Sequence, residues 1–182
     1  MADLVTGATG FTGGHLARML VARGHHVRAL VRDRSKASDL AAAGIELVEG
    51  DLRDRAALDR AVSGIERVYH IAAMYRQAGL PADTYRAVNA LAVRDLIEAA
   101  ARAGVTRVMH CSTVGVHGDV EHPPANEDAP LKPGDVYQET KLEGENLARE
   151  AGQRLGIEVT IARPTGIYGP GDRRLLKMFK GV

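Results

Sequence analysis

The chain has 182 residues, of which 45% are apolar, so it is long enough to form one globular domain with a substantial core. Lys and Arg total 24 and Asp and Glu total 23, and this balance argues against nucleic acid or an anionic membrane as the main partner. The single cysteine, Cys111, cannot form an intramolecular disulfide, which is typical of a reducing compartment. No leader precedes the first apolar run, and no run approaches the roughly 18 residues of a membrane span. We therefore expect a soluble, cytoplasmic protein.

The most informative segment lies at the beginning of the chain. A short apolar strand, Leu4–Thr6, leads into glycines at a fixed spacing, Gly7, Gly10 and Gly13, and a helical pattern follows. The first glycine permits a sharp turn, the second lets the backbone approach a pyrophosphate, and the third lets the helix pack closely on the strand. The beginning of the helix presents N–H groups and a positive dipole end to phosphates. This order of elements predicts a dinucleotide-binding site.

Apolar, partly β-branched runs alternate with helical segments along the whole chain, which is typical of βαβ units. The predicted strands are Leu4–Thr6, Val27–Val31, Glu46–Val48, Arg67–Ile71, Val105–Cys111 and Glu158–Ala162. The predicted helices are His15–Arg23, Ser38–Ala43, Arg55–Val62, Asp83–Ala103 and Val136–Leu155. We predict an α/β fold of the Rossmann type: a doubly wound parallel sheet of about six strands with helices on both faces. Ligands bind such sheets beyond the carboxyl ends of the strands.

Tyr137 and Lys141 are four residues apart at the beginning of a predicted helix, so both side chains project from one face. A nearby ammonium group favours the phenolate form of a tyrosine and lowers its pKa from about 10, which suits proton exchange with a substrate hydroxyl. The same spacing also occurs on ordinary solvated helix faces. The pair is therefore informative only together with other motifs.

The motifs occur in a characteristic order. Gly7-Ala8-Thr9-Gly10-Phe11-Thr12-Gly13 is followed by Gly50-Asp51-Leu52, His70-Ile71-Ala72-Ala73, Ser112-Thr113, the Tyr137 and Lys141 pair, and Arg163-Pro164-Thr165-Gly166-Ile167. Together they resemble an extended short-chain dehydrogenase/reductase, and more narrowly the NAD-dependent epimerase/dehydratase family. That family includes nucleotide-sugar epimerases and dihydroflavonol reductase-like enzymes. The resemblance covers essentially the whole chain.

The resemblance implies a role for each matching position. Tyr137 is the acid/base, Lys141 holds the nicotinamide ribose, Thr113 binds the reacting oxygen, and Asn89 matches a structural asparagine of the catalytic set. The implied cofactor-binding residues are Gly7, Thr9, Gly10, Phe11, Gly13, Arg32, Ser35, Lys36, Asp51, Leu52, Ala72, Ala73, Lys141, Pro164, Thr165, Gly166 and Ile167. Ser112 precedes Thr113, and we expect it to be a strand hydroxyl bonded to backbone.

The choice of cofactor depends on the end of the second predicted strand. An acidic residue there binds the ribose 2′-hydroxyl of NAD, whereas an arginine accommodates the extra phosphate of NADP. Arg32 falls where dihydroflavonol reductase-like members carry such an arginine, and Ser35 and Lys36 can add hydrogen bonds and charge. Asp33 turned toward the ribose would favour NAD instead, and Arg32 could be an ordinary solvated residue. We expect NADP in preference to NAD.

The seven histidines do not predict a metal site, because none has a partner at zinc-ligand spacing. The proline-rich stretch over residues 117–134 predicts a long surface loop, in which His117 is either exposed or at the substrate entrance.

Two reactions remain open for a small-molecule substrate: epimerisation of a nucleotide-sugar-like substrate and NADPH-dependent carbonyl reduction. Val114 and Gly115 stand where a sugar 4,6-dehydratase is expected to carry acidic residues, which disfavours dehydration. Relatives continue beyond the sixth strand with a substrate domain, so we expect residues 1–182 to form the NAD(P)-binding Rossmann domain with that second domain largely absent. A non-catalytic dinucleotide-binding module is the rival from another class. A homodimer through the helices at 83–103 and 136–155 is a further possibility, and the helix expected over 174–182 lies outside the residues described below.

Overall fold

The computed structural model describes residues 2–172 and contains one six-stranded parallel sheet with the strand order β3-β2-β1-β4-β5-β6. The strands are β1 (Ala2–Thr6), β2 (His26–Val31), β3 (Glu46–Glu49), β4 (Arg67–His70), β5 (Arg107–Cys111) and β6 (Glu158–Ala162). The order reverses between β1 and β4, so their carboxyl ends flank the crevice where a doubly wound sheet binds its ligand. The predicted fold class is confirmed.

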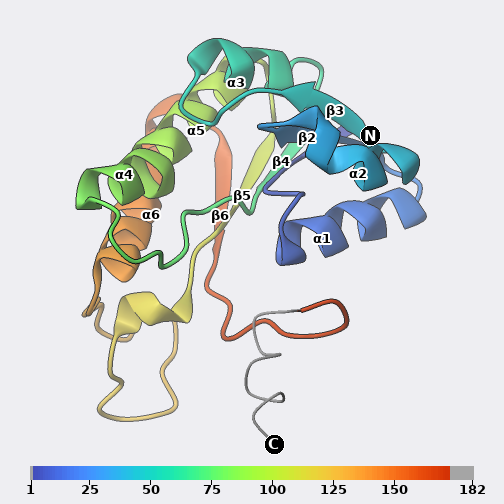
Figure 1. Cartoon of the computed structure of the whole chain (residues 1–182). Helices are drawn as coiled ribbons and strands as arrows, with labels where there is room; N and C mark the ends of the chain where they lie inside the picture. Colours follow the sequence, from blue (N-terminus) through green and yellow to red (C-terminus); the bar gives the residue numbers. More distant parts are fainter. Residues whose placement is uncertain (1, 173–182) are drawn as a thin grey trace, which may run out of the picture.

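Helices cover both faces of this sheet (Figure 1). On one face α1 (Phe11–Ala22) and α2 (Ser38–Ala42) pack against Val5 and its in-sheet neighbours. On the other face α3 (Arg55–Val62), α5 (Ala92–Arg102) and α6 (Val136–Leu155) pack against Leu4 and Val108. Leu4 and Val5 are adjacent in one strand and fully buried in different clusters, because successive strand residues point to opposite faces.

Among the predicted boundaries that differ from the structure are those near the glycine turn and near β5. Helix α1 begins at Phe11, four residues before the expected His15, because Gly13 in its first turn packs against the carbonyl of Gly7. Strand β5 begins at Arg107 rather than at Val105, whose N–H donates to the carbonyl of Ala100 at the end of α5. The helices Arg55–Val62 and Val136–Leu155 and the strand Glu158–Ala162 have the bounds that were predicted.

The single helix expected over Asp83–Ala103 is divided into three parts. Helix α4 (Ala82–Arg86) runs into a π-helical turn, η2 (Ala87–Leu91), and then into α5. A π turn inserts an extra residue into the helix and rotates the side chains that follow, and such turns frequently mark functional regions. Here the turn carries Asn89, whose contacts are described below.

The long loop after β5 begins with a short 3₁₀ helix, η3 (Val114–His117). His117 is therefore not part of an exposed loop: it is 7% exposed, its Nδ1 lies 3.3 Å from the carbonyl oxygen of Pro130, and its Nε2 lies 3.2 Å from Arg163. Another 3₁₀ helix, η1 (Arg34–Ala37), follows β2. Within residues 2–172 no helix is both long and apolar enough to cross a membrane.

Candidate active site

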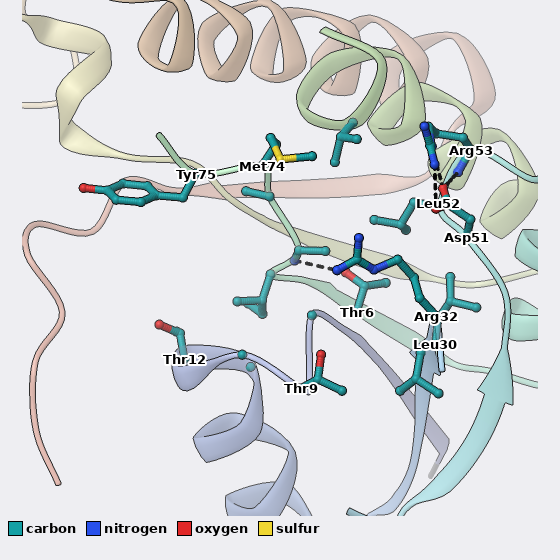
Figure 2. A pocket seen from close by; sticks show the side chains of 18 of the residues that line it. Thr6, Thr9, Thr12, Leu30, Arg32, Asp51, Leu52, Arg53, Met74 and Tyr75 are labelled. Carbon is teal, nitrogen blue, oxygen red and sulfur yellow. Dashed lines mark hydrogen bonds and ion pairs between the residues drawn. The ribbon is translucent and has the colours of Figure 1, made fainter. Parts of the chain in front are cut away.

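A cleft of about 560 Å³ opens at the carboxyl ends of β1, β2 and β4 (Figure 2). Its floor is the glycine turn predicted from the sequence. Gly7 has a φ of +73°, and a Cβ there would lie 2.7 Å from the backbone nitrogen of Ala72. A Cβ on Gly13 would lie 2.3 Å from the carbonyl oxygen of Gly7. Both positions therefore require glycine, one for its backbone conformation and one for close packing.

Gly10 has a different role, because a Cβ there would meet only the carbonyl oxygen of Gly7, at 3.3 Å. Gly10 is the N-cap of α1, and among the described residues no side chain caps this helix and no acidic residue lies in its first turn. Helix N–H groups and the positive dipole end therefore face the cleft, which fits the pyrophosphate of a dinucleotide. Other predicted residues line the same cleft: Thr9, Phe11, Leu52, Ala72 and Ala73.

Of the three cofactor-binding residues predicted after β2, one lines the cleft. Arg32 lines it, and Figure 2 shows the side chain extending into the open space. Asp33 is turned to the following 3₁₀ helix, where its carboxylate accepts hydrogen bonds from the N–H and the hydroxyl of Ser35. Lys36 pairs with Asp33 at 3.3 Å. Ser35 and Lys36 do not line the described cleft, so here the structure differs from the expectation.

The third strand contributes Asp51, Leu52 and a residue that the motif analysis did not single out, Arg53. The guanidinium group of Arg53 donates to both carboxylate oxygens of Asp51, at 2.8 and 2.9 Å. These hydrogen bonds are the largest cause that holds the pKa of Asp51 at about 2. A carboxylate therefore remains ionised at the part of the cleft that follows β3, within the field of Arg32.

A second cavity of about 360 Å³ adjoins the first, and Tyr137 lines both. Its walls include Thr113 and the four predicted residues after β6, Pro164, Thr165, Gly166 and Ile167. Thr113 is the N-cap of η3, and its hydroxyl accepts a hydrogen bond from the N–H of Gly115 at 3.1 Å. Ser112 also lines this cavity but is only 4% exposed. The fold thus brings Thr113 and Tyr137 to one cavity from separate elements.

Lys141 lines neither of the two described cavities. It is fully buried, and its ammonium group donates to the carbonyl oxygen of Cys111 at 2.7 Å. Burial lowers the pKa of Lys141 to about 8. Burial likewise raises the pKa of Tyr137 to about 12, with the thiol of Cys111 as the next cause. The expected lowering of the pKa of Tyr137 by Lys141 is therefore not what this structure has.

One helical turn beyond Lys141, Glu145 is also fully buried. Its carboxylate accepts hydrogen bonds from Arg163, at 2.7 and 2.9 Å, and from Arg149 at 3.1 Å. Burial is the largest single influence on Glu145 and opposes the charged carboxylate, but the hydrogen bonds and charges of its partners, with Arg163 foremost, together keep the pKa of Glu145 lowered. Arg163 also donates to the carbonyl of Glu127, so this buried pair connects α6 and the end of β6 to the long loop.

Asn89 in the π turn is buried and acts as a structural link. Its side-chain oxygen accepts from the N–H of Met74 at 2.8 Å, and its amide nitrogen donates to the carbonyl of Met74 and the hydroxyl of Thr140. It lines neither described cavity. Asn89 thus fixes the segment after β4 against α6, beside Tyr137.

Two buried histidines lie behind the site. His70 and His110 stack with ring centroids 5.3 Å apart, and the Nδ1 of His70 lies 2.7 Å from the hydroxyl oxygen of Thr6. Burial lowers the pKa of His70 to about 3, so this ring is neutral. Across residues 2–172 no group of three or more His, Cys, Asp or Glu side chains is arranged to hold a metal ion.

The strand order, the crevice at its reversal and the glycine turn define a dinucleotide-binding α/β domain of the Rossmann type. Residues 4–180 match the sequence profile of the NAD dependent epimerase/dehydratase family, and the chain belongs to that family.

Known relatives carry several activities. Sterol demethylase protein B of Methylococcus capsulatus is 40% identical, over 96% of this chain and 54% of its own length. A putative dihydroflavonol 4-reductase of Synechocystis is 34% identical, over 94% of this chain and 51% of its own length. The crystal structure of UDP-glucuronic acid 4-epimerase from Bacillus cereus in complex with NAD superimposes with a TM-score of 0.86 at 28% identity, covering 100% of this chain and 64% of that one. The chain spans about half the length of the curated relatives it matches.

Proposed function

We propose that this chain binds NADP(H) in the larger cleft and reduces a carbonyl compound in the adjoining cavity, with Tyr137 as the acid/base. The observation that carries this proposal is that Tyr137 lines both cavities, so a cofactor in the larger cleft and a substrate in the adjoining cavity would both lie beside it. The nicotinamide, when bound, supplies the hydride. Tyr137 donates its phenolic proton to the oxygen of the reduced carbonyl, and in the reverse direction it accepts that proton.

Thr113 orients the reacting oxygen in this proposal. Its hydroxyl oxygen already accepts a hydrogen bond from the N–H of Gly115, which fixes the side chain. A hydroxyl can accept and donate at the same time, so the O–H of Thr113 is available for the substrate oxygen. The alignment of Thr113 and Tyr137 toward one oxygen is what the protein contributes to the rate.

The preference for NADP is supported by the contrast between Arg32 and Asp33. Arg32 extends into the cleft, where a guanidinium group suits a 2′-phosphate. Asp33 instead caps η1 and pairs with Lys36, so it does not offer its carboxylate to a ribose 2′-hydroxyl. Reduction consumes NADPH, which favours a reductase over an epimerase that regenerates its cofactor.

Epimerisation of a nucleotide-sugar-like substrate is the second candidate. It is favoured by the structural similarity to the UDP-glucuronic acid 4-epimerase, which covers the whole of this chain. The two activities differ in a measurable way, because an epimerase yields no net change in the cofactor and a reductase oxidises NADPH stoichiometrically.

Turnover tests the proposal. NADPH oxidation is followed with a panel of aliphatic, alicyclic and aromatic ketones, and UDP-sugars are assayed for epimer formation. We expect oxidation with a carbonyl compound, and a loss of at least about 100-fold in Tyr137→Phe, which keeps the ring but lacks the proton. Epimer formation without net oxidation would favour the second candidate. NADPH binding without either reaction would indicate a dinucleotide-binding module, and an equally active Tyr137→Phe would exclude Tyr137 as the acid/base.

A further inference from the structure

Four side chains from two segments of the chain form a cluster that includes the phenol of Tyr137. Tyr75 and Arg76 come from the segment after β4, and Asp135 and Tyr137 come from the beginning of α6. The Nη2 and Nε of Arg76 donate to one oxygen of Asp135, at 2.5 and 2.8 Å. The central carbon of the guanidinium group lies 5.6 Å from the ring centroid of Tyr137. A cation is therefore held over the face of the ring.

The ion pair between Arg76 and Asp135 is held in place by further contacts. Asp135 is the N-cap of α6, and its other carboxylate oxygen accepts a hydrogen bond from the N–H of Gln138 at 2.8 Å. Tyr75 packs edge-on against Tyr137, with ring centroids 5.1 Å apart and an angle of 76° between the planes. Arg76 also lies 5.8 Å from the centroid of Tyr75. The guanidinium group is thus held by a carboxylate and two aromatic rings, an arrangement that favours a defined position.

We propose that Arg76, packed on the rings of Tyr75 and Tyr137, is a positioning residue whose guanidinium charge favours the phenolate form on which proton exchange depends, and that the carboxylate of Asp135 partly offsets this charge. This inference rests on the proposed function for its catalytic meaning, because it concerns the proton that Tyr137 transfers. Its physical content is independent of turnover: it states which nearby cation favours the ionised form of one phenol.

The other groups around the phenol act in the opposite direction. Burial is the largest cause that raises the pKa of Tyr137, and Cys111 at the end of β5, Tyr75 and Asp135 raise it further, whereas Arg76 lowers it. Lys141, one turn along α6, directs its ammonium group to the carbonyl of Cys111. In this structure the cation placed against the phenol is therefore Arg76, from a loop position that the motif analysis did not single out.

The test measures ionisation of Tyr137 directly, in the cofactor-free chain. The protein is labelled with tyrosine carrying ¹³C at Cζ, and its NMR spectrum is recorded from neutral pH to about pH 11, with Tyr137→Phe assigning the resonance. With a pKa of about 12, roughly a tenth of the wild-type Tyr137 is ionised at the upper end. Circular dichroism at each pH verifies that every variant remains folded.

The two halves of the ion pair give opposite results if the inference is right. Arg76→Gln removes the cation, and we expect the ionised fraction of Tyr137 at about pH 11 to fall to roughly a third of the wild-type fraction. Asp135→Asn keeps an N-cap oxygen and removes the carboxylate charge, while Arg76 stays charged and packed on the rings of Tyr75 and Tyr137, so we expect the ionised fraction of Tyr137 to rise about twofold. Both substitutions break the same ion pair, and a merely structural role would shift both in one direction. Arg76→Lys keeps the positive charge, and we expect its ionised fraction of Tyr137 to be closer to the wild-type value than that of Arg76→Gln.

Arg86→Gln is the matched control. Arg86 also reaches α6, where it pairs with Glu143 at 2.7 Å, and its side chain is 51% exposed against 50% for Arg76. We expect no change in the ionised fraction of Tyr137 in this variant. The inference is overturned if Arg76→Gln and Asp135→Asn shift the fraction in the same direction, or if Arg76→Gln changes it no more than Arg86→Gln. The NMR titration requires no catalytic activity, so it gives a result even if the chain shows no turnover. The two proposals are therefore tested separately.

Discussion

Lys141 lies one helical turn after Tyr137, and its buried ammonium group donates to the carbonyl oxygen of Cys111, 2.7 Å away at the end of β5. The helix face that carries Tyr137 therefore continues into a charged interior. Glu145 follows one turn later and is buried with Arg163. This row of ionisable side chains makes the stability of the domain depend on pH.

The first prediction concerns Lys141. Its pKa is about 8 in the folded protein and 10.5 without burial, so the unfolded chain binds the proton more tightly between these values. The free energy of unfolding therefore rises as the pH increases from about 8 to about 10.5. Folding in this range releases the proton of Lys141, and that release becomes easier as the pH increases. The gain attributable to this residue is up to about 3 kcal/mol. The measurement is urea unfolding of the wild type and of Lys141→Met at several pH values in this range. The contribution of Lys141 is the change with pH in the difference between the two free energies of unfolding. A pH-independent difference would contradict the burial of the charged group.

The second prediction concerns the glycine turn. Gly7→Ala introduces a Cβ 2.7 Å from the backbone of Ala72 in addition to the strain of a positive φ, and we expect a loss of about 3 kcal/mol or more together with loss of NADPH binding. Gly24→Ala is the control, because its φ is +82° but nothing lies within 4 Å of the added Cβ. We expect it to cost only about 1 kcal/mol and to leave binding unchanged. Equal losses in the two variants would mean that the close approach at Ala72 is unimportant.

The third prediction concerns the buried Glu145. Glu145→Gln leaves Arg163 without its carboxylate, and we expect a loss of about 3 kcal/mol in the free energy of unfolding. The long loop at 118–134 should also become more susceptible to proteolysis, because Arg163 contacts both Glu127 and His117.

Glu143→Gln serves as the comparison for this loss, since it breaks a surface pair with Arg86 and should cost less than about 1 kcal/mol. In the wild type the contribution of Glu145 is present above its unfolded pKa and is lost as the pH falls through its lowered folded pKa. If the two glutamate variants have the same stability and the same cleavage pattern, the buried pair does not secure the loop.

Much of the fold follows from local pattern. The alternation of apolar runs with helical segments predicts the strands and helices, and the glycine spacing predicts the position of the cleft, because these signals depend on neighbouring residues. The division of the helix at 83–103 was not predicted, since a π turn around Asn89 is stabilised by contacts with Met74 and Thr140 that are distant in sequence.

In the candidate site, too, the positions that local motifs specify were predicted, whereas those set by other contacts were not. Arg32 and Thr113 line the cavities where their motifs placed them, whereas Ser35 and Lys36 face Asp33, because a capping interaction two or three residues away takes precedence. Arg53 and Arg76 belong to no motif, and Arg163 begins one in which it was assigned no role. Their roles come from a carboxylate partner in each case, and only for Arg53 is that partner, Asp51, close in sequence.

The most direct test of the account is a titration of the purified chain with NADPH and with NADH, followed by nicotinamide fluorescence. Arg32→Asp is compared with Arg34→Asp, which makes the same charge change at an exposed residue that does not line the cleft. The account predicts that NADPH binds at least about tenfold more tightly than NADH, and that Arg32→Asp removes this preference while Arg34→Asp keeps it. NADH binding as tight as NADPH, unchanged by Arg32→Asp, would contradict it.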